Sequence, residues 1–234
     1  MQVVILAGGL GTRMRAVDPL RPKALMPVAG RPFIEWQFAL LKRNGLTDVV
    51  LSIGHMGDQI MRHVQDGSAW GIRVRYVCED PTALRGTAGA LVHALPLLDE
   101  EFLMLYGDSY LPIPFGPVMA AFQRSGCEAL MTVIRNRGAW DASNARVEGE
   151  RVVFYSKKAA PGEADWIDYG LLAFKRVVIQ RYERHAVPLD LSVVLGDLVG
   201  QGTLAAYEAP HRFYEIGKPE GLRDLETYLS GAAP

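Results

Sequence analysis

A short apolar run that breaks into glycines, close to the first residue, constrains the fold of this chain more than any other feature. Residues 3–7 (VVILA) are apolar throughout, as in a buried strand, and residues 8–13 (GGLGTR) follow directly. A strand that ends in a glycine turn exposes backbone N–H groups, which can hold phosphate oxygens. Arg13 and Lys23 add the positive charge that a polyphosphate needs. The pattern predicts an α/β protein that binds a nucleoside triphosphate at this loop.

Two better-known glycine loops do not fit these residues. The dinucleotide-binding pattern GxGxxG accommodates Gly9 and Gly11 but places Met14 where its third glycine belongs. The P-loop pattern GxxxxGK[ST] does not occur in this region. The remaining alternative is an ordinary tight turn of an α/β protein, which the added residues 12–13 (TR) and 22–23 (PK) disfavour.

The same residues resemble a known family, the sugar-1-phosphate nucleotidyltransferases or sugar-nucleotide pyrophosphorylases. Its patterns LAGGxGTRM and PKxLxPVxG[RK]P are similar to residues 6–14 and 22–32, and the resemblance resumes further along the chain. It implies an α/β fold, Rossmann-like and three-layered (α/β/α), with a mixed, mainly parallel central sheet: the nucleotide-diphospho-sugar transferase fold. It also implies a single nucleotidyltransferase domain over residues 1–234, without the β-helical or acyltransferase extension of some relatives.

The composition fits a soluble enzyme. A chain of 234 residues can bury a full core in one α/β domain, with two small domains as the alternative. The net charge of −1 argues against nucleic-acid or membrane partners. Two cysteines, Cys78 and Cys127, suit a reducing compartment, and neither a signal-peptide pattern nor a membrane-spanning apolar run occurs. We therefore expect a cytoplasmic protein, with a homo-oligomer left open.

Strand and helix patterns alternate in the first half of the chain. Apolar runs predict strands at 3–7, 49–53, 73–77 and 102–106, and helical periodicity predicts helices at 33–44, 58–65 and 87–94. This alternation predicts a parallel sheet with right-handed crossovers. Ligands of such sheets collect at the carboxyl ends of strands, where residues 8–13 and 107–108 fall.

The second half is less regular. Its patterns predict strands at 128–134, 145–147, 152–155, 167–174, 204–207 and 212–216, and helices at 115–124, 190–200 and 219–229. The second and third of these strands are expected to form a hairpin around Gly149, and Asp190 is expected to cap its helix.

Two acidic residues are candidates for a Mg²⁺ site. Asp108 follows a predicted strand, where it could hold Mg²⁺ together with phosphate oxygens or simply cap a turn. The resemblance implies the metal role, because the family has Gly-Asp here. The family's second metal ligand is an aspartate in an aromatic-x-D-x-G-T-P-E segment, at which this chain has Glu215, and Lys218 in place of Thr. The longer glutamate shifts the carboxylate by about 1.5 Å, and an ordinary surface charge is the alternative.

The resemblance also implies residues that hold the sugar phosphate. Lys157 falls where the family has the lysine of Glu-Lys-Pro, with Ser156 in place of Glu and Lys158 as the reserve candidate. A solvated pair of lysines is the alternative. Further on, Asp168 could accept hydrogen bonds from sugar hydroxyls while Gly170 permits close approach, or Asp168 could be a half-exposed charge at the start of a strand.

Base recognition is expected between residues 79 and 90. The segment around Gly86 and Thr87 resembles the family's LGT[AG]GA, and a polar residue shortly before it reads the base edge, for which Glu79 or Asp80 is the best match. A carboxylate suits a base edge rich in N–H donors, so GTP is favoured, then CTP, then UTP. The full set of predicted nucleotide-binding residues is Leu6, Ala7, Gly8, Gly9, Gly11, Thr12, Arg13, Glu79, Gly86 and Thr87.

The implied reaction transfers a nucleotidyl group. A sugar-1-phosphate oxygen attacks the α-phosphorus of the NTP in line, and pyrophosphate leaves. Arg13 would bind the leaving pyrophosphate, Lys23 the α-phosphate, and Asp108 and Glu215 the Mg²⁺. Among the branches of the family, the pattern most resembles the one that makes nucleotide-activated heptoses and related bacterial surface sugars (the heptose-1-phosphate guanylyltransferases).

Two alternative functions have to be tested. One is a non-catalytic module that senses nucleotides or sugar nucleotides, supported by the departures at Ser156 and Glu215. The other is a nicotinamide-dependent oxidoreductase, disfavoured by Met14 and by the lack of an acidic residue after the second predicted strand.

Overall fold

The computed structural model of the protein describes residues 1–16, 18–138 and 140–231. Contacts within the chain divide it into two compact units. The first unit comprises Met1–Leu84, Leu105–Pro112 and Phe213–Pro234, and the second comprises Arg85–Met104 and Ile113–Arg212. The chain therefore crosses between the units four times, after residues 84, 104, 112 and 212.

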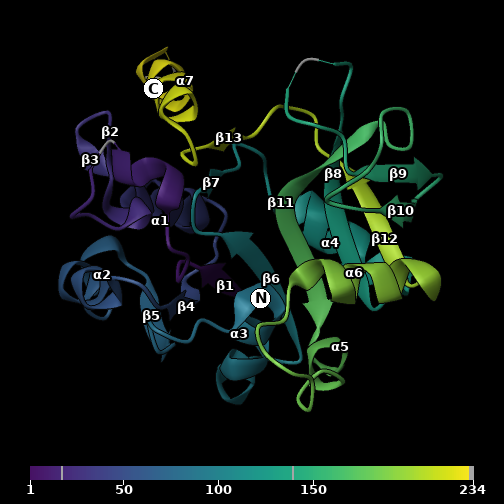
Figure 1. Cartoon of the computed structure of the whole chain (residues 1–234), viewed down its shortest axis with the longest axis horizontal. Coiled ribbons are helices and arrows are strands. Elements are labelled where there is room, and N and C mark those ends of the chain that lie inside the picture. Colours follow the sequence, from purple (N-terminus) through teal and green to yellow (C-terminus); the bar gives the residue numbers. More distant parts are fainter. Residues whose placement is uncertain (17, 139, 232–234) are drawn as a thin grey trace. The chain divides into compact units, whose positions relative to one another are not determined.

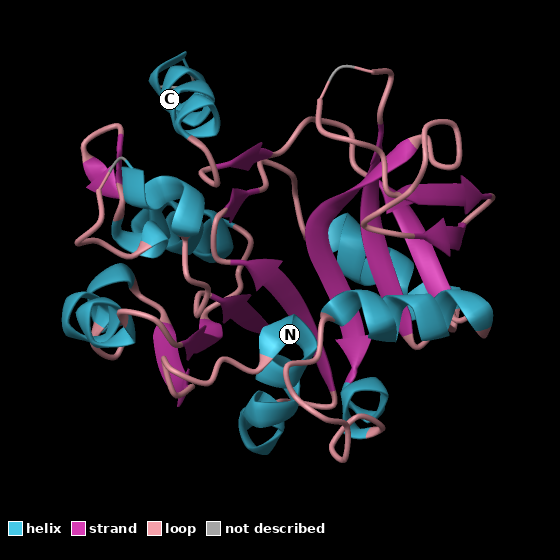
Figure 2. Ribbon diagram, in the orientation of Figure 1, coloured by secondary structure: helices cyan, strands magenta, loops and turns pink. Residues whose placement is uncertain are grey.

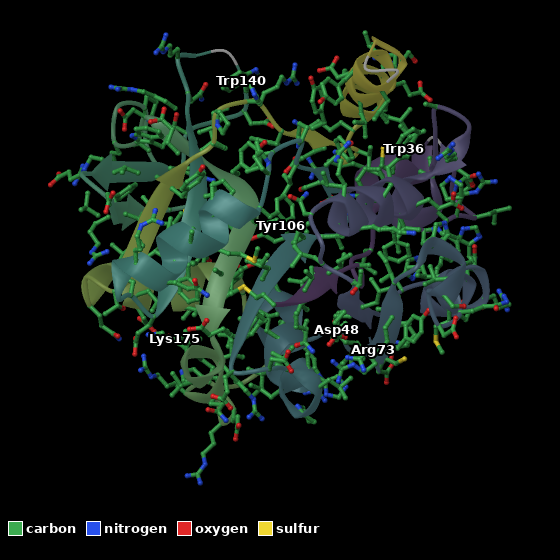
Figure 3. The ribbon with its side chains drawn as sticks, turned by 180° about the vertical axis from the view of Figure 1, so that it is seen from behind. Trp36, Asp48, Arg73, Tyr106, Trp140 and Lys175 are labelled. Atoms are coloured by element: carbon green, nitrogen blue, oxygen red, sulfur yellow. The ribbon has the colours of Figure 1, made fainter. Side chains whose placement is uncertain are left out.

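Parallel strands form the core of the first unit (Figure 1). Strands β1 (Gln2–Leu6), β4 (Asp48–Ile53) and β5 (Arg73–Cys78) pair in the order β5-β4-β1. Val3, Val4 and Ile5 of β1 and the apolar residues of β4 are buried, as continuous apolar runs in a parallel sheet should be. Asp48 and Arg73 lie side by side where β4 and β5 begin (Figure 3), with Arg73 Nη2 2.8 Å from Asp48 Oδ2.

Helices connect these strands. Helix α1 (Phe33–Arg43) buries an apolar face and ends at Asn44, after which Gly45 takes a φ of +72°. Such a left-handed residue ends helices because glycine carries no Cβ. Helix α2 (Gly57–Val64) follows β4 and precedes β5. Both helices were predicted from the sequence within one or two residues of their observed bounds.

Two small ladders complete the first unit. Strands β2 (Pro27–Val28) and β3 (Arg31–Pro32) form one, and β7 (Ser109–Tyr110) and β13 (Tyr214–Glu215) form the other, both antiparallel. Helix α7 (Pro219–Gly231) follows β13. None of the ladders was predicted as such, because strands of two residues are too short for a visible pattern; the strand expected at 212–216 is only β13.

The second unit contains a mixed set of strands. Strands β8 (Ala129–Arg135), β9 (Ala145–Glu148), β10 (Arg151–Tyr155), β11 (Trp166–Lys175) and β12 (Leu204–Glu208) occur in the order β11-β8-β12-β10-β9. Among the described pairs of these five strands, β12–β8 alone is parallel, and Trp166 of β11 also pairs with Ala145 of β9. The predicted β9–β10 hairpin is confirmed. Strand β6 (Glu101–Tyr106) begins in the second unit and ends in the first.

Figure 2 draws the helices of the chain in cyan. The α-helices described in the second unit are α3 (Gly86–Ala94), α4 (Gly116–Ser125), α5 (Arg176–Gln180) and α6 (Leu191–Gly200). Asp190 caps α6 as predicted, because its side chain accepts the Ser192 N–H. Short 3₁₀ helices occur at Thr12–Ala16, Lys23–Leu25, Ser68–Trp70 and Leu95–Leu97. No described helix is long and apolar enough to cross a bilayer.

Candidate functional site

The glycine loop after β1 presents open backbone N–H groups. Within the described residues, the N–H groups of Gly9, Leu10 and Gly11 have no hydrogen-bond acceptor. Gly8 lies against the end of β4, where a Cβ added to it would come within 3.1 Å of the backbone nitrogen of Gly54. The loop thus combines close packing on one side with unsatisfied donors on the other, which is the arrangement that binds anions.

Arg13 follows this loop in a 3₁₀ helix. Its side chain is exposed, whereas that of the next residue, Met14, is buried in the core. The Met14 N–H donates to the Gly11 carbonyl at 2.9 Å. Met14, which does not fit a dinucleotide-binding loop, therefore anchors the turn that carries Arg13.

Three charged side chains of the first unit converge at one point. Lys23 Nζ lies 2.8 Å from Asp108 Oδ2. A Cβ added to Gly217 would lie 3.7 Å from Arg13 Nη2, 3.8 Å from Asp108 Oδ2 and 3.9 Å from Lys23 Nζ. Arg13, Lys23 and Asp108, which the sequence separates by up to 95 positions, thus surround the same glycine. We call these four residues the Gly217 cluster.

Close backbone packing holds Asp108 at the end of β6. The Gly107 N–H donates to the Leu6 carbonyl of β1 at 2.9 Å. A Cβ on Gly107 would come within 2.7 Å of that carbonyl oxygen and 2.9 Å of Ala7 Cα, so only glycine fits here. Asp108 and the glycine loop therefore follow adjacent backbone segments. Both lie at the carboxyl ends of strands, where the ligands of parallel sheets are expected to bind.

Gln37 supports the same turn and was missed in the sequence. Its buried side chain lies on α1, and Nε2 donates to the Tyr106 carbonyl at 3.0 Å and to the Ser109 carbonyl at 2.9 Å. These carbonyls bracket Gly107 and Asp108. The sequence did contain a signal for this role. Gln37 is a polar residue on the apolar face of a predicted helix, and a buried amide requires hydrogen-bond partners.

Glu215 lies on the ladder beside Asp108. It pairs with Ser109, and the neighbouring Ile216 N–H donates to the Asp108 carbonyl at 2.9 Å. Gly221 at the start of α7 packs against this strand, since a Cβ there would overlap the Glu215 carbonyl oxygen. The backbone therefore brings the two predicted metal ligands to one ladder, although no group of three or more His, Cys, Asp or Glu suited to a metal occurs in the described part of the chain.

The residues expected near the base differ in their surroundings. Glu79 follows β5 and is 8% exposed, and its N–H donates to the Ile53 carbonyl at 2.8 Å. Asp80 is exposed and accepts hydrogen bonds from the Thr82 side chain and N–H, which hold the pKa of Asp80 below its usual value. Asp80 is thus committed to its own turn.

Gly86 and Thr87 make contacts within the second unit that the sequence did not predict. Thr87 Oγ1 accepts the Leu191 N–H at 2.8 Å. A Cβ on Gly86, whose φ is +77°, would lie 2.5 Å from the Leu189 carbonyl oxygen. The two residues hold the segment before α6, whatever else they bind.

Lys157 and Asp168 belong to a network of charged and polar groups in the second unit. Lys157 Nζ lies 2.7 and 2.8 Å from the two carboxylate oxygens of Asp190, whereas the side chain of Lys158 makes no hydrogen bond or ion pair with a described residue. Asp168 accepts the Gly170 N–H at 2.9 Å, at a bulge of β11 where Gly170 takes a φ of +89°. Of the two lysine candidates, Lys157 is the one in the network.

Burial and charge shift the acidities in this network. Burial raises the pKa of Asp168 to about 6, although hydrogen bonds from Gly170 and Tyr155 and the charge of Lys157 act in the opposite direction. Burial and the Asp168 charge raise the pKa of Tyr155. Burial would also raise the pKa of Asp190, but hydrogen bonds from Lys157 and Ser192 lower it below its usual value. Asp190 therefore remains ionised as the partner of Lys157.

Comparison with known proteins identifies the family. The model of the MobA-like NTP transferase domain matches residues 3–186. The chain belongs to this family. Nucleotidyl transfer by MobA-like NTP transferases generally depends on a metal ion. The match covers the glycine loop, Lys23, Asp108, Lys157 and Asp168, and it ends before Glu215.

Individual members support the sequence resemblance. Over 124 residues, the chain is 42% identical to an N-acetylmuramate alpha-1-phosphate uridylyltransferase of Neisseria meningitidis, which covers 53% of this chain and 52% of that protein. Over 113 residues, it is 34% identical to a D-glycero-alpha-D-manno-heptose 1-phosphate guanylyltransferase of Campylobacter jejuni, covering 48% and 50%. The matched part thus spans about half the length of these relatives.

The fold is also found in solved structures. HddC from Yersinia pseudotuberculosis, crystallised with GMP-PN, superimposes with a TM-score of 0.80 at 21% identity over 97% of this chain and 99% of that one. The predicted fold class, the nucleotide-diphospho-sugar transferase fold with a mixed sheet, is confirmed.

Proposed function

We propose that the protein is a sugar-1-phosphate nucleotidyltransferase, which converts an NTP and a sugar-1-phosphate into a nucleotide sugar and pyrophosphate. The Gly217 cluster beside a loop of unpartnered N–H groups is the observation that carries this proposal. Two cations and one carboxylate around a glycine, where no side chain fills the space, suit a triphosphate and its metal ion. The family match supports the same reaction.

The first unit binds the triphosphate. The N–H groups of residues 9–11, the predicted nucleotide contacts from Leu6 to Thr12, and Arg13 hold the phosphates, with Arg13 stabilising the leaving pyrophosphate. Lys23 neutralises the α-phosphate. To do so, its ammonium leaves Asp108 and binds a phosphate oxygen instead. Glu79 reads the base, and Gly86 and Thr87, which belong to the second unit, are the further proposed contacts of the nucleotide.

Asp108 and Glu215 would hold a divalent cation, which we propose is Mg²⁺. The residues fit this ion, because Asp108 already attracts a cationic group at 2.8 Å and Gly217 leaves room beside it. Two carboxylates suffice, since Mg²⁺ keeps several waters and takes phosphate oxygens. When bound, the ion supplies positive charge to the reacting phosphates.

The second unit binds the sugar phosphate. Lys157 provides the cation for the phosphate, and Asp168, beside Gly170, accepts hydrogen bonds from sugar hydroxyls. No nucleophilic side chain is required, because a phosphate oxygen of the sugar-1-phosphate attacks the α-phosphorus and the bond to pyrophosphate breaks. The two units together make up a single nucleotidyltransferase domain over residues 1–234, whose last three residues lie outside the described part.

The identity of the substrates is proposed from weaker observations. The carboxylate of Glu79 favours GTP, and the C. jejuni relative is a guanylyltransferase, but the N. meningitidis relative is a uridylyltransferase. We therefore keep GTP first, with CTP and UTP as alternatives, and a surface-sugar phosphate such as a heptose-1-phosphate as acceptor. A cytoplasmic location and a homo-oligomer also stay predictions.

A substrate matrix tests the proposal. Each of four NTPs is incubated with a panel of sugar-1-phosphates and Mg²⁺, and pyrophosphate release is measured. Turnover of one pair well above the others supports the transferase, and a preference for UTP would contradict the GTP prediction. Nucleotide binding without turnover of any pair would favour the sensing module, the alternative for which the replacement of Asp by Glu215 is the supporting observation.

A further inference from the structure

Lys157 is held by one carboxylate before any substrate arrives. Its Nζ contacts Asp190 Oδ1 at 2.7 Å and Oδ2 at 2.8 Å, and each side chain is about half exposed (47% and 48%). An ammonium has three N–H donors, so two of them engage Asp190 and one stays available. The pair is accessible, and its geometry is fixed from the Asp190 side.

Asp190 is itself held at the N-terminus of α6. Its Oδ1 accepts the Ser192 N–H at 2.9 Å, as an N-cap, while both oxygens serve Lys157. A capping carboxylate cannot rotate freely without losing this hydrogen bond. The direction of the carboxylate therefore follows from the position of the helix.

The residues on both sides of Asp190 are bonded to the first turn of α3. The Leu189 carbonyl accepts N–H groups from Ala88 at 3.0 Å and Gly89 at 3.1 Å, and the Leu191 N–H donates to Thr87 Oγ1. Gly86 allows this contact, since a Cβ there would overlap the Leu189 carbonyl. Residues 86–89, which lie in the segment that resembles a nucleotide-binding motif, thus also hold the backbone on both sides of Asp190 in place.

From these contacts we infer that Asp190 is a positioning residue for the sugar phosphate: it holds the Lys157 ammonium with one N–H free for a phosphate oxygen. The inference rests on the proposed function, in which Lys157 binds that phosphate. A lysine has a long flexible side chain, and holding it in advance reduces the freedom that is lost when the phosphate binds. Asp190 touches no substrate in this role and affects affinity rather than the chemical step.

Asp190→Ser and Asp190→Asn separate this role from helix capping, because Ser and Asn cap nearly as well as Asp. We expect Asp190→Ser to raise KM for the sugar-1-phosphate about fivefold, the scale of a half-exposed ion pair. The values of kcat, KM for the NTP and Tm should stay unchanged. Asp190→Asn, which keeps one acceptor for Lys157, should recover part of the loss. As a matched control, Glu128→Gln removes the Arg181–Glu128 ion pair of the same unit and should leave both KM values unchanged.

A second measurement needs no substrate. Amine acylation of Lys157 is compared with that of Lys158 by mass spectrometry, and Asp190→Ser should raise the Lys157/Lys158 ratio. An equal ratio in both proteins would overturn the inference, even if no substrate pair is turned over and the proposed function fails. An unchanged KM for the sugar-1-phosphate in an active Asp190→Ser variant would also overturn the inference. A lowered KM would overturn it too, because Asp190 would then compete with the phosphate for Lys157.

Discussion

The Gly217 cluster of the first unit and the Lys157 network of the second hold their charges by different means. In the first, Gly107 and Gly221 allow backbone segments to pack closely beside Asp108 and Glu215, so that the backbone fixes where these two residues lie. In the second, a lysine, two aspartates and a tyrosine hold one another, and Lys157 and Asp190 stay half exposed. The first arrangement suits groups that act on the reacting phosphates, and the second suits adjustable binding of a sugar phosphate.

The largest effect is expected at Asp108. Asp108→Asn removes a proposed metal ligand and the partner of Lys23, and should lower kcat by about a thousandfold in pyrophosphate release. Metal removal with EDTA should abolish activity of the natural chain, and Mg²⁺ should restore it. Asp48→Asn, which removes a carboxylate that pairs with Arg73 in the same unit, should keep normal activity. An Asp108→Asn enzyme with a tenth of normal turnover would contradict the metal assignment.

Glu215 should come next. Glu215→Ala should lower the metal-dependent rate by about a hundredfold, because one of two proposed carboxylate ligands is lost. The measurement is kcat at saturating Mg²⁺, with Glu220→Ala on the exposed part of α7 as control. Turnover near that of the natural chain would show that Glu215 is an ordinary surface charge.

The second unit should respond in affinity rather than rate. Lys157→Ala should raise KM for the sugar-1-phosphate about tenfold, the value of one charge-assisted hydrogen bond, with a small change in kcat. Lys158→Ala is the matched control and should have no effect. If Lys158→Ala gave the larger change, the reserve candidate would be the phosphate ligand, and the contrast between the two regions would lose its basis.

The last prediction concerns the stability of the protein rather than its activity, and it is made for Asp168. Its pKa is raised from 3.8 to about 6, so between these pH values the folded state binds more protons than the unfolded state. Asp168 therefore lowers the stability of the protein as pH rises through this window. Asp168→Asn should be more stable than the natural chain by about 3 kcal/mol at pH 7, with no difference below pH 4. Thermal unfolding at several pH values measures this, and parallel curves for the two proteins would refute it.

Much of the fold could be predicted because its signals are local. The apolar run before the glycine loop predicted β1, and the helical pattern from Phe33 with its Asn44–Gly45 end predicted α1. The ladder of β7 and β13 could not be predicted, because pairing of two-residue strands is decided by segments about a hundred positions apart. Buried Gln37 and the Lys157–Asp190 ion pair escaped for the same reason.

Local sequence was enough to predict the strand–loop unit near the start, the family resemblance, and the residue types available for phosphate and metal. Each depends on neighbours along the chain, where periodicity and glycine content act directly. The folded chain was needed to show that Lys23 pairs with Asp108, that Gly217 lies near both of them and Arg13, and that Asp190 contacts Lys157. Such contacts depend on which strands pair and in which register, and this follows from burial of the whole core rather than from any local pattern.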